Sequence, residues 1–139
     1  MAITAVIFDL DGVLVSTHDY HYQSWKKMTD EEGIHFTREM NHKLRGLSRR
    51  QSIEVILDEV NSEYSEKKKK ELMARKNQYF RQLIKKELTS ADILPGVIAL
   101  LKELKKRNIK TGVASASKNS SIILSRLELE EYFSVVADG

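Results

Sequence analysis

The spacing of hydrophobic and polar positions changes twice along the chain. The segment Ala5–Leu10 is apolar up to its first acid, which predicts a strand buried on both faces, as in a parallel sheet. Residues 17–90 repeat their apolar positions at helical spacing and predict an all-helical block. Residues 109–114 and 134–137 are then expected as strands, separated by helices. This order predicts an α/β fold: a parallel sheet covered by helices, with a helical block inserted after its first strand.

Several residues mark where the predicted helices begin and end. Gly33 is expected to end the first helix of the block. Ser48 with Gln51 three residues later forms a capping box, and Ser65 caps a longer helix. The break at Leu94-Pro95-Gly96 precedes the next helix. These boundaries place the helical block at residues 17–90 and the sheet in residues 1–16 and 91–139.

Composition narrows the class of protein. The chain has 139 residues, of which 41% are hydrophobic, enough for one domain that carries a small insertion. It has no cysteine, which excludes disulfides and cysteine zinc sites and fits a cytoplasmic protein. The sequence shows neither the basic leader of a signal peptide nor an apolar stretch long enough to span a membrane. We therefore expect no membrane partner.

The net charge is +3, and the basic excess lies in residues 17–90. Such a segment suits an anionic ligand such as a sugar phosphate. Its most basic run is Lys67–Lys70, which lacks interleaved aromatic residues and is flanked by Glu66 and Glu71. We therefore interpret this run as a solvated helix face and expect no nucleic-acid partner.

Two carboxylates follow the first predicted strand directly. Asp9 and Asp11 are spaced i, i+2, so on an extended backbone they point to the same side, and Gly12 permits a sharp turn. Open α/β sheets bind ligands at the carboxyl ends of their strands. Burying two like charges close together is costly unless a cation or a proton compensates, and a divalent ion with oxygen ligands, most naturally Mg²⁺, would do so. For an isolated acid pair, the alternative is a solvated loop that ends the strand.

The segment Phe8–Val13 resembles the first motif of the haloacid dehalogenase superfamily, Asp-x-Asp-Gly-Val/Thr. The resemblance implies a Rossmann-like core, with the helical block as its cap. It also implies that Asp9 attacks phosphorus and becomes an aspartyl phosphate, and that Asp11 donates a proton to the leaving oxygen. Both residues would be ligands of Mg²⁺.

A second segment carries hydroxyl groups after the second predicted strand. A serine at a strand end, before a helix, is a natural oxyanion site, although Ser115 taken alone is more often a helix cap. Beside Asp9, it resembles the superfamily's second motif, with Ser115 as a phosphate ligand. The run of residues 114–119, Ala-Ser-Ala-Ser-Lys-Asn, resembles that of the β-phosphoglucomutase-like group of the superfamily. This resemblance places four more residues around the same phosphate or sugar: Ala116, Ser117, Lys118 and Asn119.

The resemblance to this group extends through the helical block. Residues 20–26 are similar to its first cap helix, which implies that His21 positions Asp11 and that Trp25 lines the sugar site. Residues 44–49 resemble its specificity loop, in which Arg49 holds the phosphate that is not transferred. The remaining matched positions are a hinge at Thr17 and substrate contacts at Gly46, Ser48, Ser52 and Lys76.

Each of the helical-block assignments has a simpler alternative. Without the surrounding motif, His21 is a surface histidine, Trp25 a core residue and Arg49 a solvated residue of a first helical turn. In that position Arg49 lies unfavourably against the helix dipole, which favours a special role.

The implied activity is a monomeric phosphosugar mutase that interconverts β-glucose 1-phosphate and glucose 6-phosphate. It would work through an aspartyl phosphate and a 1,6-bisphosphate, with small-molecule sugar phosphates as its partners. Two alternatives remain: a sugar-phosphate phosphatase with water as acceptor, and a module that binds phosphosugars without turnover. The superfamily's third-motif lysine and fourth-motif acids would follow the third strand. We therefore expect an N-terminal fragment of a longer enzyme, poorly stable and weakly active alone, with one side of its first strand unpaired.

Overall fold

A computed structural model describes residues 2–139 of the chain. The described chain forms two compact units, which we call the sheet unit (residues up to Thr17, with Glu87–Gly139) and the helical unit (His18–Lys86). The strands are β1 Ala5–Phe8, β2 Lys110–Ala114 and β3 Val135–Ala137. The helices are α1 His18–Glu31, α2 Arg38–Lys43, α3 Arg49–Glu59, α4 Glu66–Glu87, α5 Val97–Lys106 and α6 Ser120–Arg126, with short 3₁₀ turns η1 Ser90–Asp92 and η2 Glu130–Tyr132.

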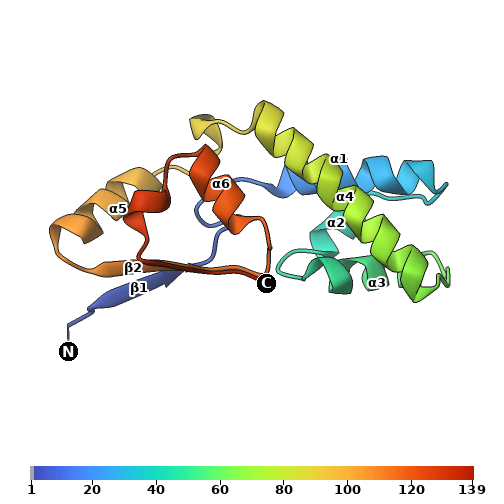
Figure 1. Ribbon diagram of the computed structural model, residues 1–139, viewed down its shortest axis with the longest axis horizontal. Coiled ribbons are helices and arrows are strands. Elements are labelled where there is room, and N and C mark those ends of the chain that lie inside the picture. Colours follow the sequence, from blue (N-terminus) through green and yellow to red (C-terminus); the bar gives the residue numbers. More distant parts are fainter. Residues whose placement is uncertain (1) are drawn as a thin grey trace. The chain divides into compact units, whose positions relative to one another are not determined.

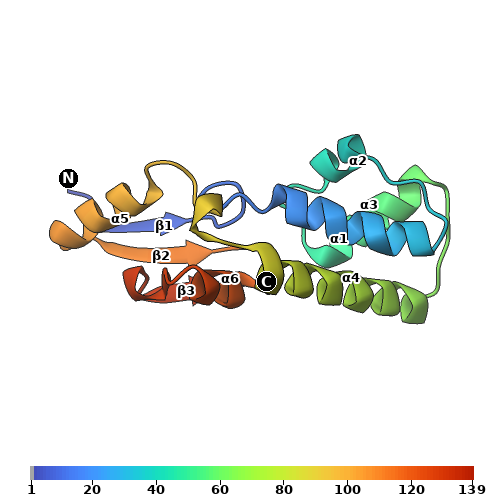
Figure 2. The same ribbon diagram turned by 90° about the horizontal axis from the view of Figure 1, so that it is seen from above.

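The sheet unit confirms the predicted α/β class. Its strands form a parallel sheet in the order β1-β2-β3, which can be followed in Figure 2. One row of the register runs from Ile7 through Gly112 to Val135. Helices α5 and α6 lie on one face of the sheet (Figure 1). Within the described residues β1 pairs only with β2, so it is an edge strand, as expected.

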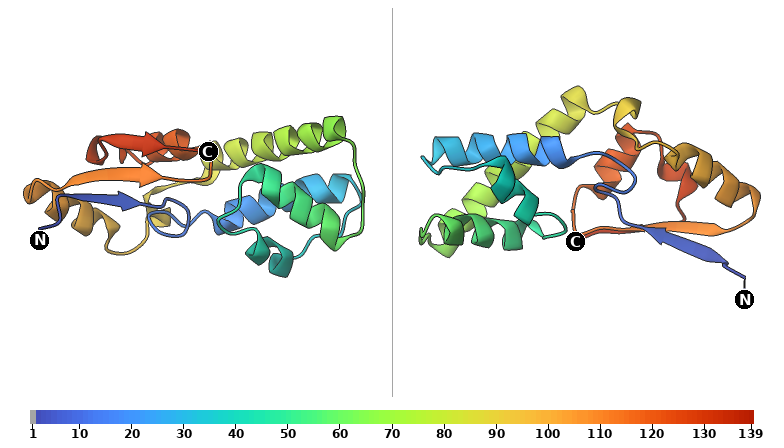
Figure 3. Two further views of the ribbon diagram at one scale, coloured as in Figure 1. Left: turned by 90° about the horizontal axis from the view of Figure 1, so that it is seen from below. Right: turned by 180° about the vertical axis from the view of Figure 1, so that it is seen from behind.

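The prediction that the first strand is buried on both faces is wrong. The side chain of Ile7 is 70% exposed and that of Val135 is 58% exposed. Alternate residues of a strand point to opposite faces, and α5 and α6 cover only the face opposite Ile7. Figure 3 shows the other face of the sheet without a covering helix. An apolar run therefore identified the strand correctly, but it could not show whether both faces have a partner.

The helical unit confirms several predicted helix boundaries. Ser48 accepts a hydrogen bond from the backbone N–H of Gln51, and the Gln51 side chain accepts one from the backbone N–H of Ser48, which completes the capping box. Ser65 accepts from the backbone N–H of Lys68 at the start of α4. Gly33 follows α1 in the left-handed conformation, with φ +69°. These local interactions are encoded within a few residues, which is why the spacing alone predicted them.

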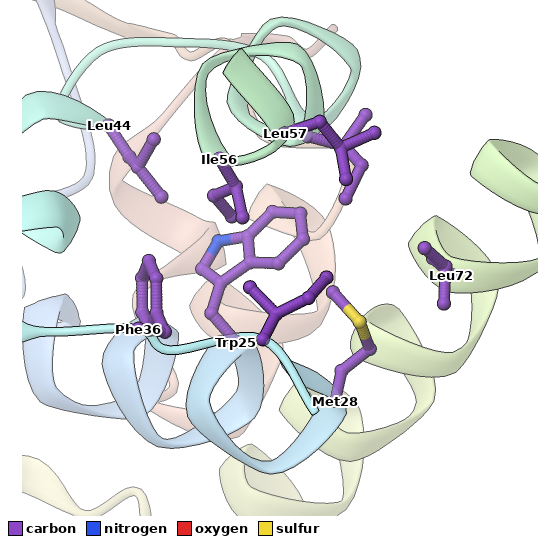
Figure 4. Close-up of a cluster of buried hydrophobic side chains, with 9 residues drawn as sticks. Trp25, Met28, Phe36, Leu44, Ile56, Leu57 and Leu72 are labelled. Atoms are coloured by element: carbon purple, nitrogen blue, oxygen red, sulfur yellow. The ribbon is translucent and has the colours of Figure 1, made fainter. Parts of the chain in front are cut away.

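A closed apolar cluster holds the helical unit together (Figure 4). The Trp25 ring lies at its centre, surrounded by side chains from α1, α3, α4 and the segments beside α2. Ile53, Ile56 and Leu72 are fully buried in it. The remaining members are Met28, Ile34, Phe36, Leu44 and Leu57.

The surface of the helical unit is covered with ion pairs. Within the Lys67–Lys70 run, Lys68 pairs with Glu32 at 3.1 Å and Lys69 with Glu54 at 2.9 Å. The run therefore lies on a helix surface, as predicted, and acids of neighbouring segments partly neutralise its charge. No helix within residues 2–139 combines the length and the apolar character that crossing a membrane requires.

Candidate active site

The structure brings the first acid and the first serine to the same edge of the sheet. The parallel register of β1 and β2 ends with Phe8 opposite Val113. Asp9 is the next residue after β1, and Ser115 is the next residue after β2. The backbone N–H of Ser115 donates to the carbonyl of Ala137 at 2.9 Å, which ties this segment to β3. The two segments therefore follow the carboxyl ends of adjacent strands, where α/β sheets place their ligands.

A tight turn orders the two carboxylates. Gly12 has φ +75°, and its N–H donates to the carbonyl of Val15 at 2.8 Å. The N–H of Leu10 donates to Oδ1 of Asp9 at 2.7 Å. Asp9 is exposed, so its carboxylate is accessible to a substrate from solvent. A non-glycine residue at position 12 would strain this turn.

Asp11 is held from a different direction. It is half-buried, and its Oδ1 accepts a hydrogen bond from the hydroxyl of Thr17, whose side chain is 0% exposed. The loop that carries Asp11 also pairs with the segment after the helical unit. The Ser16 N–H donates to the carbonyl of Asp92 at 2.8 Å, and the Leu94 N–H donates to the carbonyl of Leu14 at 3.0 Å. In the structure Thr17 thus orients Asp11, at the place where the sequence predicted a hinge.

Asp9 and Asp11 offer the oxygen donors that Mg²⁺ prefers. Among residues 2–139, no three His, Cys, Asp or Glu side chains converge on one point. Protein sites for Mg²⁺ commonly use one or two carboxylates and complete the shell with water and substrate phosphate. The chemistry of these two side chains therefore fits part of a magnesium shell.

The hydroxyls after β2 belong to a chain of local hydrogen bonds. Ser115 Oγ accepts from the N–H of Ser117, and Ser117 Oγ accepts from the N–H of Asn119, each at 3.1 Å. Asn119 is buried, whereas Ala116 and Lys118 are exposed. The two serines accept hydrogen bonds from the loop backbone, but neither caps α6, whose N-cap is Asn119 without a side-chain cap bond. Since a hydroxyl that accepts a hydrogen bond keeps its own proton, both serines can still donate to a phosphate oxygen.

In the helical unit, Arg49 is held by a side chain that the sequence analysis did not identify. Arg49 is the first residue of α3, directly after the Ser48 cap, and Gly46 lies before it with φ +75°. Its Nη2 donates to Oδ1 of Asn77 on α4 at 2.7 Å, across 28 positions of the sequence. Burial lowers the pKa of the Arg49 guanidinium from its ordinary value. No local pattern marks Asn77, because its partner lies on another helix.

A second basic side chain, that of Lys76, is buried on α4 and directly precedes Asn77 in the sequence. Lys76 is 4% exposed, and its Nζ lies 3.0 Å from Nδ1 of His21. The same Nζ lies 5.0 Å from the centre of the Trp25 ring and 4.7 Å from that of Phe80. His21 stacks on Phe80 with ring centres 4.2 Å apart. Nζ of Lys76 and Nδ1 of His21 thus lie within hydrogen-bond distance, and the two aromatic rings favour a positive charge on Lys76.

The predicted site residues fall into the two units. The sheet unit holds Asp9, Asp11, Thr17, Ser115, Ala116, Ser117, Lys118 and Asn119. The helical unit holds His21, Trp25, Gly46, Ser48, Arg49, Ser52 and Lys76. Trp25 is a central core residue and Ser52 is buried one turn after Arg49, so both occupy positions that packing alone explains.

Comparisons with known proteins bear on the family of the chain. The family model for haloacid dehalogenase-like hydrolases matches residues 6–139. A β-phosphoglucomutase of Bacillus subtilis (strain 168) is 46% identical over 136 residues, which are 96% of this chain and 60% of that protein. A phosphorylated carbohydrates phosphatase of Thermotoga maritima is 28% identical over 97% of this chain and 61% of its own length.

A solved structure shows the same fold. The crystal structure of a β-phosphoglucomutase from Clostridium difficile matches with a TM-score of 0.93 and 43% identity. The match covers 99% of this chain and 62% of that one. The chain thus spans about 60% of the length of the curated relatives that it matches.

Proposed function

Since the chain belongs to the haloacid dehalogenase-like hydrolase family, we propose that the protein carrying it is a phosphosugar mutase that interconverts β-glucose 1-phosphate and glucose 6-phosphate. The observation that carries this proposal is the acid pair Asp9 and Asp11 beside Ser115, in a chain 46% identical to the B. subtilis β-phosphoglucomutase. Because the chain spans 60% of that relative, the activity is proposed for the whole protein that contains these residues.

In the first half-reaction, a carboxylate oxygen of Asp9 bonds to phosphorus as the bond between phosphorus and the sugar oxygen breaks. Asp11 donates a proton to that leaving oxygen. The enzyme is left with an aspartyl phosphate, which splits one difficult transfer into two easier ones. The accessible position of Asp9 and the hydrogen bond from Thr17 to Asp11 support this division of roles.

In the second half-reaction, a hydroxyl oxygen of a sugar phosphate bonds to phosphorus as the bond to Asp9 breaks. Asp11 accepts the hydroxyl proton, and the product is the 1,6-bisphosphate. That bisphosphate turns over and returns its other phosphoryl group to Asp9. Asp11 therefore serves as the acid in the first half-reaction and as the base in the second.

Positive and hydrogen-bonding groups are needed to hold the phosphate. Mg²⁺ held by Asp9 and Asp11 would supply charge that screens the repulsion between the Asp9 carboxylate and the phosphate. The hydroxyls of Ser115 and Ser117 and the ammonium of Lys118 bind the phosphoryl group that is transferred. Arg49 binds the phosphate that stays on the sugar, through its planar fork of donors.

A second candidate function keeps the same chemistry and changes the acceptor. The T. maritima relative, named a phosphorylated carbohydrates phosphatase, is the observation that favours it. In that reaction water attacks the aspartyl phosphate and inorganic phosphate is released.

The deciding experiment follows phosphorus. The purified product of the complete reading frame is mixed with β-glucose 1-phosphate, MgCl₂ and a trace of glucose 1,6-bisphosphate, and ³¹P NMR follows the species. The mutase produces glucose 6-phosphate without net release of inorganic phosphate. Release of phosphate as the main product would instead establish the phosphatase. Binding of the sugar phosphate without either product would identify a module that binds without turnover.

A further inference from the structure

Seven lysines and arginines of the helical unit form ion pairs with carboxylates. Arg50 lies 2.6 Å from Glu66, Lys69 lies 2.9 Å from Glu54, and Arg75 lies 2.6 Å from Glu71. Further pairs join Lys26 to Asp30, Arg38 to Asp19, Lys43 to Glu59 and Lys68 to Glu32. A phosphate that approached any of these cations would have to displace a carboxylate first.

Arg49 differs in the charge of its partner. Its side chain donates to the neutral amide oxygen of Asn77, and Arg49 takes part in none of the ion pairs found among residues 2–139. An amide oxygen orients a guanidinium without cancelling its charge. Since this hydrogen bond uses Nη2, the N–H groups on Nε and Nη1 of the guanidinium can still donate to an anion.

The surroundings of Arg49 strengthen the attraction for an anion. Its guanidinium is partly buried, and a charge in a less polar environment attracts an opposite charge more strongly than it does in water. The backbone beside it is also fixed, because Ser48 and Gln51 close the capping box at the start of α3. Arg49 is therefore placed, oriented and left with its full positive charge.

We propose that Asn77 is a positioning residue, which orients the Arg49 guanidinium for the phosphate of a sugar phosphate while leaving its charge uncancelled. That the anion is a sugar phosphate rests on the proposed function. Asn77 itself acts through Arg49 and needs no contact with the substrate.

The alternative is that Asn77 only ties α3 to α4, and one substitution separates the two roles. Asn77→Asp keeps an acceptor for Arg49 and forms a stronger bond to it, but cancels its charge. As a tie between helices, aspartate is at least as good as asparagine. As a positioning residue it is worse, because the phosphate must compete with the new carboxylate.

The experiment compares Asn77→Ala, Asn77→Asp and the control Gln78→Ala in the product of the complete reading frame. Gln78 is the exposed neighbouring residue on α4. We expect Asn77→Ala to weaken binding of glucose 6-phosphate in calorimetry, and to raise its KM, by about tenfold with a smaller effect on kcat. Asn77→Asp should weaken binding at least as much while its melting temperature is unchanged or raised. Gln78→Ala should leave binding and KM unchanged.

Wild-type affinity in Asn77→Asp would overturn the proposal, and so would wild-type affinity in Asn77→Ala. If Asn77→Ala fails to fold, Asn77→Asp decides the question alone, because it keeps the hydrogen bond between the helices. The calorimetry also separates this inference from the proposed function. A wild-type protein without mutase turnover, whose phosphate binding still depends on Asn77, would refute the mutase and leave the positioning role intact.

Discussion

The two units of the chain differ in how they use their apolar residues. The helical unit surrounds its cluster on every side, and Ile53, Ile56 and Leu72 have no exposed surface. The sheet unit covers one face of its sheet with α5 and α6 and leaves Ile7 and Val135 exposed on the other. A helical block can close a core with its own helices, whereas a sheet presents two faces and needs a partner for each.

The units also differ in the chemistry of their candidate groups. The sheet unit presents acids and hydroxyls on the segments that follow its strands. The helical unit presents Arg49 beside the amide of Asn77, and Lys76 beside the ring of His21. This difference means that bond-making and anion selection can be impaired separately, and the following experiments use that separation.

The largest effect is expected from Asp9→Asn in the sheet unit. The amide has the same shape as the carboxylate but cannot attack phosphorus, so kcat should fall on the order of 10⁴-fold. A coupled assay for glucose 6-phosphate measures the rate, and acid quenching measures the phosphoenzyme, which should be absent. Asp58→Asn, at an exposed position of α3, is the matched control and should retain full activity. Substantial turnover in the Asp9 variant would refute its nucleophilic role.

The next effect concerns the closed core. Ile56→Ala removes a fully buried side chain from the cluster around Trp25, so the free energy of unfolding should fall by about 2–5 kcal/mol. Urea denaturation measures the change. Hydrogen exchange should show that amides of α1, α3 and α4 lose protection first. A loss below about 0.5 kcal/mol would mean that the cluster is less closely packed than the structure indicates.

A smaller effect is expected from acid, and it should concentrate in the helical unit. A hydrogen bond from Arg75 lowers the pKa of the Glu71 carboxyl, and one from Arg50 lowers the pKa of Glu66, both from an ordinary value of 4.5. Because folding lowers these pKa values, the pairs contribute fully above about pH 4.5, and their contribution is lost as the pH falls through the lowered values.

Urea denaturation of the wild type and Arg75→Gln between pH 7 and pH 3 measures this contribution. The variant should lose less stability than the wild type over that range, since part of the acid-sensitive pairing is already gone. Arg107→Gln, which removes the exposed pair with Glu103 in α5, controls for the loss of any surface arginine. Parallel pH profiles of the wild type and Arg75→Gln would contradict the assignment.

The smallest effect is expected at the uncovered sheet face. Ile7→Thr keeps a β-branched side chain in β1, and Ile7 is 70% exposed, so the free energy of unfolding should change by less than about 0.5 kcal/mol. Urea denaturation and sedimentation velocity test this expectation together. A loss above about 2 kcal/mol would show that the face is covered in solution, and a shift in sedimentation coefficient would identify a second copy as the cover.

Elements encoded by neighbouring residues were predicted well. The capping box of Ser48 and Gln51 spans three positions, and Gly33 ends α1 as expected. The positions of Asp9 and Ser115 at the ends of β1 and β2 were also predicted, because both directly follow apolar strand runs. Asn77 was missed, since nothing within its own helix distinguishes it from a solvated asparagine. The burial of Ile7 was predicted wrongly, because an apolar run reports the character of a strand and not its neighbours.

The sequence by itself determined the order of the elements, the helix caps and the position of the acid pair, because these depend on interactions within a few residues. Only the tertiary structure decided that Asn77 meets Arg49 across 28 positions, that Lys76 meets His21 across 55, and that one sheet face is exposed. Those features depend on which helices and strands pack together. Packing is set by the summed burial of many side chains, and so it cannot be inferred from the spacing around any one of them.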